Sequence, residues 1–179
     1  MDDAELLSQT EHVSEIFTRI MLKTMSAGPA EEITLAQFHA LKHVALHGSC
    51  TIGSIAEGLS ISQPAATMLV DRIAKRGLVE RRTGRNDRRQ AEILLTRHAQ
   101  DLLQEIESER ANRLRRILEL MAPRKRRRFV ESLESFVAAA LKLEESVDEA
   151  CLHCGIEHQP DCIVNQTKLA LAGRDIERT

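Results

Sequence analysis

The stretch Thr51–Thr96 decides the fold of this chain of 179 residues, and it reads TIGSIAEGLSISQPAATMLVDRIAKRGLVERRTGRNDRRQAEILLT. Thr51 can cap a short first helix, because its side chain can accept from free backbone N–H groups. Ser62 can cap a second helix, with Pro64 in the first turn, where a missing N–H group costs nothing. Gly77 is placed to end that second helix. The stretch therefore predicts two helices joined by a tight turn.

Two short strands separated by a basic loop follow the second helix. The segments Val79–Arg82 and Ala91–Leu95 read as strands, and the turn formers between them predict a hairpin. Two helices and a basic hairpin in this order are typical of a winged helix-turn-helix, whose second helix enters the DNA major groove. Between Asp71 and Gln90 there are eight basic and three acidic residues, whereas the whole chain has a formal net charge of −2. Positive charge focused in this way predicts local contact with the phosphates of double-stranded DNA.

The side chains expected to touch DNA divide between the second helix and the hairpin. Base-edge contacts are expected from the first turns of the helix, at Ser62, Gln63, Ala65 and Thr67. Contacts with phosphate or the minor groove are expected from five basic residues, Arg72, Lys75, Arg85, Arg88 and Arg89. A carboxylate is repelled by phosphate, so Asp87 is expected to brace the hairpin through a nearby arginine.

Two segments carry a recognisable pattern. Residues Asp87–Thr96 read DRRQAEILLT, and residues Ile33–Leu41 read ITLAQFHAL. They resemble the D-x-R-x-x-x-[VI]-x-L-T signature and the L-T-x-x-Q-x-x-x-L helix start of the MarR family of transcriptional regulators. The resemblance covers roughly residues 3–145. It implies a homodimer whose two recognition helices address successive major grooves of a pseudo-palindromic operator, and a small effector bound between the dimerisation and DNA-binding regions.

The rest of the chain is rich in amphipathic helical patterns. Apolar residues recur at helical spacing from about Asp3 to Met25, from Arg97 to about Met121, and after Pro123 to about Ala150. The expected fold is mainly α with a small β-wing, a winged helix-turn-helix plus a helical dimerisation region. The expected divisions are an N-terminal dimerisation helix at 1–32, a DNA-binding domain at 33–96, C-terminal dimerisation helices at 97–149 and a cysteine-containing tail at 150–179. Aromatic residues make up only 2% of the chain, and helices with such modest cores often dimerise.

Three histidines recur at every fourth position of the helix predicted over Leu35–His47, namely His39, His43 and His47. Two histidines at this spacing can ligate a metal. A polar helix edge is the favoured interpretation, because neither a carboxylate nor a cysteine sits in the same helix. The family resemblance adds a third option, in which the stripe borders an effector pocket, with His39 and His43 as the candidate residues.

The tail carries three of the four cysteines in a C-x2-C-x7-C pattern, at Cys151, Cys154 and Cys162. These thiolates could hold zinc or an iron–sulfur cluster, with His153 or His158 as the fourth ligand. A reversible thiol switch and inert cysteines remain open alternatives. If a metal centre is bound, its loss would reorient the last helix and so change the affinity for the operator.

The sequence also limits the classes of protein that this chain can belong to. No segment approaches the ~18 consecutive apolar residues of a membrane span, and the acidic start MDDAELL is unlike a secretory signal, so no membrane contact and a cytoplasmic protein are expected. No glycine-rich phosphate loop, G-x-S-x-G motif or paired carboxylate site stands out, so an enzyme is not expected. The leading hypothesis is a homodimeric repressor controlled by a signal. One alternative is a regulator that responds to a small aromatic or phenolic ligand, with thiol-switch or inert cysteines. Another is a metal-binding or thiol enzyme or interaction module, using for example Cys154 and His158.

Overall fold

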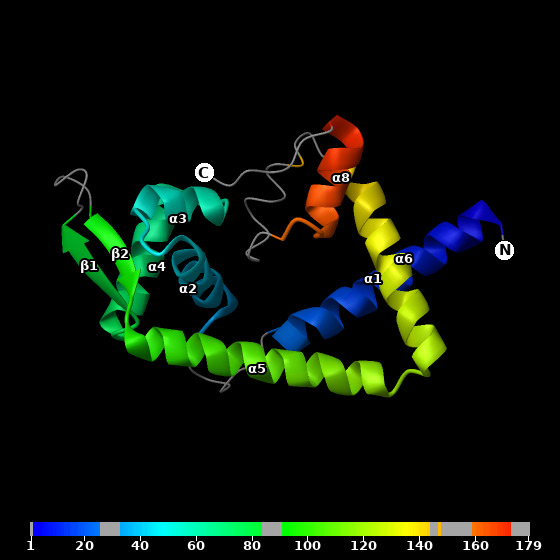
Figure 1. Cartoon of the computed structure of the whole chain (residues 1–179), viewed down its shortest axis with the longest axis horizontal. Helices are drawn as coiled ribbons and strands as arrows, with labels where there is room; N and C mark the ends of the chain where they lie inside the picture. Colours follow the sequence, from blue (N-terminus) through cyan, green and yellow to red (C-terminus); the bar gives the residue numbers. More distant parts are fainter. Residues whose placement is uncertain (1, 26–32, 84–90, 144–146, 148–158, 173–179) are drawn as a thin grey trace.

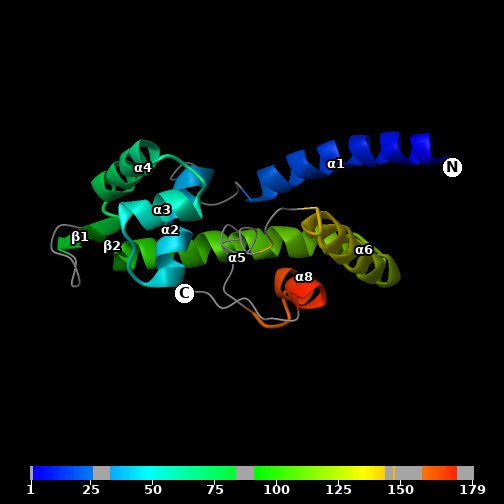
Figure 2. The same ribbon diagram turned by 90° about the horizontal axis from the view of Figure 1, so that it is seen from above.

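A long helix joins a small mixed lobe to an arm of helices (Figure 1). The computed structural model describes residues 2–25, 33–83, 91–143, 147 and 159–172. Its elements in chain order are α1 Asp3–Met25, α2 Leu35–His47, α3 Ile52–Gly58, α4 Gln63–Lys75, β1 Val79–Thr83, β2 Ala91–Leu95, α5 Arg97–Glu119, α6 Pro123–Leu141 and α8 Ile163–Ala172. The lobe contains α2, α3, α4 and the two strands at one end of α5, and α1, α6 and α8 lie toward the other end (Figure 2). The expected class, mainly helical with a small β-wing, is confirmed.

The helices of the lobe begin at polar caps, as the sequence predicts. Thr34 accepts a hydrogen bond from the backbone N–H of Gln37, and Thr51 accepts one from that of Ser54. Ser62 caps α4 in the same way, and Pro64 lies in the first turn. Such a cap stabilises a helix by about 1 kcal/mol relative to alanine, so local chemistry fixes where these helices start.

A two-stranded hairpin and one isolated β-bridge make up the β structure of the lobe. The strands β1 and β2 pair antiparallel in a register that runs from Val79 opposite Leu95 to Thr83 opposite Ala91. Cys50, in the turn between α2 and α3, adds an isolated bridge to Ile93 of β2. The hairpin is therefore attached by backbone hydrogen bonds to the loop that precedes the helix-turn-helix.

The core of the lobe is aliphatic and includes the first half of α5. The buried set combines α2, α3, α4, the strands and α5, with Leu41, Ile55, Val70, Ile73, Leu78, Ile93, Leu102 and Ile106 among its members. The sequence pattern places Ala45 on the buried side of α2, but Ala45 is exposed and Ala40 and Val44 are buried. This prediction is wrong because α3, α4, α5 and β2 pack against the side of α2 that carries Ala40 and Val44, and they leave Ala45 in contact with solvent.

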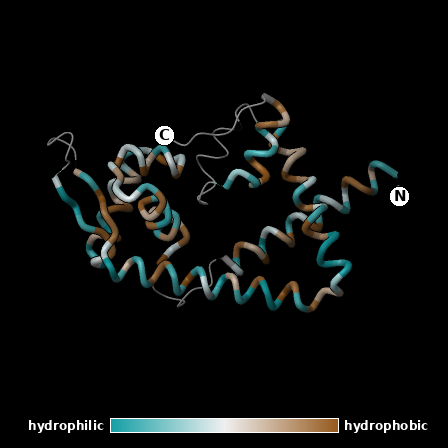
Figure 3. Tube along the Cα trace, viewed as in Figure 1, coloured by the Kyte–Doolittle hydropathy of each residue, from teal (hydrophilic) through white to brown (hydrophobic). Residues whose placement is uncertain are grey.

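The arm of helices keeps many apolar side chains in contact with solvent. Along α1, α5 and α6, hydrophobic residues alternate with polar ones outside the lobe (Figure 3). Phe17 of α1 packs near Phe129 of α6, with ring centroids 6.2 Å apart. The last long helix is predicted to reach about Ala150, yet α6 ends at Leu141. The additional helix α8 packs against α6 and buries Asn165, which the family pattern does not anticipate.

None of the helices in the described ranges is both long enough and apolar enough to cross a membrane.

Candidate nucleic-acid interface

The N-terminal half of α4 presents the side chains that are predicted to meet base edges. Ser62, Gln63 and Ala65 are exposed, while Ala66 and Val70 on the opposite face are buried in the core. The core therefore holds the helix by one side and leaves its first turns open. Ser62 combines this exposure with capping, because its oxygen accepts from the N–H of Ala65 at 3.4 Å.

Thr67 is more constrained than its neighbours in this set. Its side chain is half-buried, and its hydroxyl donates to the backbone oxygen of Gln63 at 2.9 Å. The hydroxyl oxygen remains able to accept a hydrogen bond, and the methyl group can make apolar contacts. Thr67 therefore lies with the other three predicted residues, but with its donor engaged inside the helix.

Basic side chains flank these first turns. Arg72 and Lys75 are exposed on the second half of α4, as predicted. The ion pairs found within the described ranges do not involve these two residues. Arg81 of β1, in contrast, is paired with Asp71, and this pair joins the hairpin to α4. Arg82 pairs with Glu80 at 2.9 Å within the same strand.

The predicted tip of the hairpin falls in residues 84–90. Arg85, Asp87, Arg88 and Arg89 therefore lie outside the described residues. The first strand, β1, ends at Thr83 and the second, β2, begins at Ala91, both at the end of the hairpin that lies away from α5 (Figure 1).

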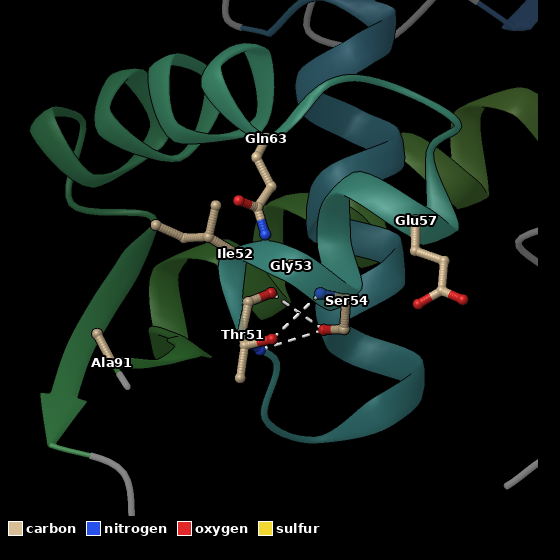
Figure 4. Close-up of a pocket in the computed structure, with 7 residues that line it drawn as sticks. All are labelled: Thr51, Ile52, Gly53, Ser54, Glu57, Gln63 and Ala91. Atoms are coloured by element: carbon tan, nitrogen blue, oxygen red, sulfur yellow. Dashed lines mark hydrogen bonds between the residues drawn. The ribbon is translucent and has the colours of Figure 1, made fainter. Parts of the chain in front are cut away.

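A hollow of about 570 Å³ lies where α3, α4 and β2 meet (Figure 4). It is lined by Thr51, Ile52, Gly53, Ser54, Glu57, Gln63 and Ala91. Thr51 and Ser54 hydrogen-bond reciprocally beside it, each backbone N–H donating to the other's hydroxyl oxygen at 3.1 Å. The Gln63 side chain extends from α4 toward α3 (Figure 4). Both helices and the hairpin therefore border one open surface.

The histidines of the predicted stripe contact different parts of the molecule. His39 keeps part of its surface exposed near α5, and the partial burial of its ring, followed by the charges of Arg110 and Lys42, lowers its pKa. His43 is buried and packs against Gly58 of α3. The effector role of His39 and His43 stays a prediction.

A charged and aromatic junction lies beside His39. The Arg110 guanidinium of α5 sits over the Phe38 ring of α2, 3.5 Å from its centroid. Burial lowers the pKa of Arg110, and its Nε has no hydrogen-bond partner among the described residues. Lys42 pairs with Glu107 at 2.6 Å across the same two helices. No local sequence pattern identifies Arg110, because its proximity to Phe38 depends on how α2 and α5 pack.

The cysteine tail is only partly described. Cys162 is half-buried, and its Sγ accepts from the N–H of Asn165 at 3.3 Å at the start of α8. Cys151, Cys154, His153 and His158 lie outside the described residues. The proposed metal set in the tail thus stays a prediction.

Known proteins resemble this chain in sequence and in fold. Residues 33–91 match the MarR family. An uncharacterised HTH-type transcriptional regulator of Bacillus subtilis, YfiV, is 29% identical over an alignment of 144 residues that covers 76% of this chain and 88% of that protein. The HTH-type transcriptional repressor MdtR of the same organism is 28% identical over 96 residues, or 54% of this chain and 59% of that protein.

Among solved structures, the YusO protein of Bacillus subtilis superposes with a TM-score of 0.67 at 23% identity. The superposition covers 78% of this chain and 99% of YusO, and it supports the fold. The relatives in sequence are regulators of transcription, which agrees with the expectation that this chain is not an enzyme.

Proposed function

We propose that this chain, a winged helix-turn-helix regulator of transcription that belongs to the MarR family, is a homodimeric repressor. The dimer binds a pseudo-palindromic operator and releases it on a signal. The observation that carries this proposal is the exposed N-terminal half of α4, fixed to the core by its other face and flanked by Arg72 and Lys75. A helix held in this way can place side chains in a major groove while the basic residues meet phosphates.

The first test separates base reading from phosphate contact. Preferred sites are selected from random duplex DNA with the full-length chain, and affinities are then measured over a range of salt. Gln63→Ala is expected to lose about 1–3 kcal/mol on the preferred site and nothing on unrelated DNA. Lys75→Ala, the matched control, is expected to weaken both equally and to reduce the salt slope by about 1. If Gln63→Ala binds all sequences as the unchanged chain does, α4 is not the reading helix.

The homodimer is supported by the apolar surface of the arm. Large hydrophobic side chains on α1, α5 and α6 are exposed in the single chain, among them Leu7, Val13, Leu114, Val130, Leu133 and Phe136. Continuous apolar faces of this kind are usually covered by a partner, and a second copy would cover the same helices on both chains. A symmetric dimer would also supply the second recognition helix that a palindrome requires.

A small aromatic anion is the effector that the α2–α5 junction favours. Arg110 offers a desolvated positive charge with a spare donor, and Phe38 and His39 supply ring surfaces beside it. Calorimetric titration with benzoate is expected to detect binding that Arg110→Met removes. Binding of equal strength by the Arg110→Met variant would place the effector elsewhere.

The alternative signal is a metal centre in the tail, held by Cys151, Cys154 and Cys162 with His153 or His158. It is supported by the spacing of these residues. The absorption spectrum and the metal content of protein purified without oxygen distinguish the cases. Visible bands with iron and sulfide indicate an iron–sulfur cluster, and stoichiometric zinc in a colourless protein indicates a zinc site. Metal-free protein rejects a resident metal centre in the tail.

A further inference from the structure

Three metal-binding side chains meet at the end of α2, away from the cysteine tail. They are His43 and His47 of the helix and Cys50 of the following turn, spaced H-x3-H-x2-C. One ligand atom from each of the three lies within 4.8 Å of the other two. In a tetrahedral zinc site, metal–nitrogen and metal–sulfur bond lengths place such atoms about 3.4–3.6 Å apart. Side-chain shifts of roughly 1 Å would therefore close the set around an ion.

Neighbouring contacts already orient His47. Its Nδ1 lies 2.7 Å from the backbone oxygen of His43, and a carbonyl oxygen can only accept a hydrogen bond. Nδ1 is therefore the protonated nitrogen, and the lone pair is on Nε2. Metal-bound histidines in proteins commonly donate their other ring nitrogen to a carbonyl in this way.

The other two residues are held by the core. His43 is buried against Gly58 of α3, and its ring centroid is 4.3 Å from that of His47. Cys50 is also buried, and its backbone is paired with Ile93 through hydrogen bonds of 3.1 and 2.7 Å. The donors on both sides of the turn are thus positioned by α3 and β2, which reduces the entropy lost when a ligand orders them.

We propose that His43, His47 and Cys50 form a site for one thiophilic transition-metal ion, with Zn²⁺ as the expected ion. Two imidazoles and one thiolate suit zinc and disfavour calcium or magnesium, which take oxygen ligands. Three protein ligands leave the fourth tetrahedral position for water or a small anion. This site shares no residue with the predicted tail centre.

Solvent reaches the site from the side of His47. That residue is exposed, and it lines a hollow of about 440 Å³ together with Gly48, Ser49, Arg82, Thr83, Glu92 and Leu94. The hollow lies between the end of α2 and the hairpin, so an ion can enter without opening the core. A bound ion would crosslink the end of α2 to the turn that is bridged to β2.

The test uses an untagged full-length chain in which Cys151→Ser, Cys154→Ser and Cys162→Ser remove the thiols of the tail. Co²⁺ serves as the probe, because a tetrahedral cobalt ion with a thiolate ligand has intense visible bands and a sulfur-to-metal charge-transfer band. We expect one Co²⁺ per chain with both features, and stoichiometric displacement by Zn²⁺. His47→Gln and Cys50→Ser in this background are each expected to abolish the charge-transfer band or the tight binding. His98→Gln, which changes an exposed histidine of α5, is the matched control and should bind as the background chain does.

His47 is chosen for substitution because its side chain is exposed, so replacing it should leave the core and the folding of the chain unchanged. His47→Gln should therefore unfold at the same urea concentration as the background chain in the absence of metal. With Zn²⁺ present, the melting temperature of the background chain should rise and that of His47→Gln should not, because a ligand stabilises only the state that binds it. Absence of a thiolate band in the background chain, or a cobalt spectrum unchanged by His47→Gln, would overturn the site. Both readouts are independent of DNA binding.

Discussion

Gly58 shows how closely single residues are fitted around the end of α2. A Cβ atom added there would lie 2.1 Å from Cε1 of His43, so the buried ring would have to shift against its neighbours in the core. We expect Gly58→Ala to lower the free energy of unfolding by about 1–3 kcal/mol, measured by urea denaturation. Gly53→Ala in the same helix is the control, because its nearest neighbour, Nε2 of Gln63, would be at 3.4 Å. Equal effects at both glycines would contradict this packing.

His39 predicts a pH effect with a definite sign. Burial, reinforced by Arg110 and Lys42, lowers its pKa in the folded state below the value of about 6.5 in the unfolded chain. As the pH falls below about 6.5, the unfolded chain takes up this proton first, so stability decreases until the folded His39 is protonated too.

Replacing the titrating group should remove that loss. We expect His39→Gln to lose less stability than the unchanged chain between pH 7.5 and pH 5, in paired urea denaturation experiments. Comparing the differences cancels the other groups that titrate in both proteins. If the stability of the two chains falls in parallel with pH, the pKa of His39 is not lowered in the folded state.

At the scale of elements, the pair between Asp71 and Arg81 sets the charge that α4 and β1 present together. Both side chains are partly exposed, at 47% and 41%, so the pair contributes at most about 1 kcal/mol to stability. Its larger effect is expected on DNA, because the carboxylate neutralises an arginine beside the recognition helix. Asp71→Asn should therefore bind unrelated DNA more tightly and with a salt slope steeper by about 1.

The control for the Asp71–Arg81 pair is a second exposed ion pair, which lies on α1 outside the lobe. Glu15→Gln breaks the pair between Glu15 and Arg19 on α1, which also removes one negative charge from the chain. If this variant tightens DNA binding as much as Asp71→Asn, net charge alone accounts for the change.

At the scale of the whole molecule, the proposed homodimer would be formed through the uncovered arm. Phe136 of α6 is 62% exposed, and Leu133 lies one turn before it. The double variant Leu133→Asp/Phe136→Asp is expected to sediment as a monomer, because two carboxylates would have to be buried in the dimer interface. Ser132→Asp, at an exposed polar position of the same helix, should remain a dimer. Dimers of equal stability for both variants would show that this face of α6 is not in the interface.

Local signals in the sequence were sufficient for the helix-turn-helix and its hairpin. Thr34, Thr51 and Ser62 cap the helices that follow them, and Gly77 adopts the positive φ of 67° that ends α4. These features act within a few residues, so they can be read without knowing what packs against them. The exposure of Gln63 and Arg72 followed from helical periodicity for the same reason.

By itself, the sequence determined the order of elements from α1 to α6, the exposed N-terminal half of α4 and the concentration of basic residues around it. Only the tertiary structure decided that α6 ends at Leu141, that Arg110 lies over Phe38, and that the Cys50 thiol joins His43 and His47. Periodicity within α2 could not reveal the last of these. Cys50 lies outside the helix, and its position depends on a bridge to Ile93, more than 40 residues away. Contacts between distant segments arise from packing of the whole core, and no local pattern encodes them.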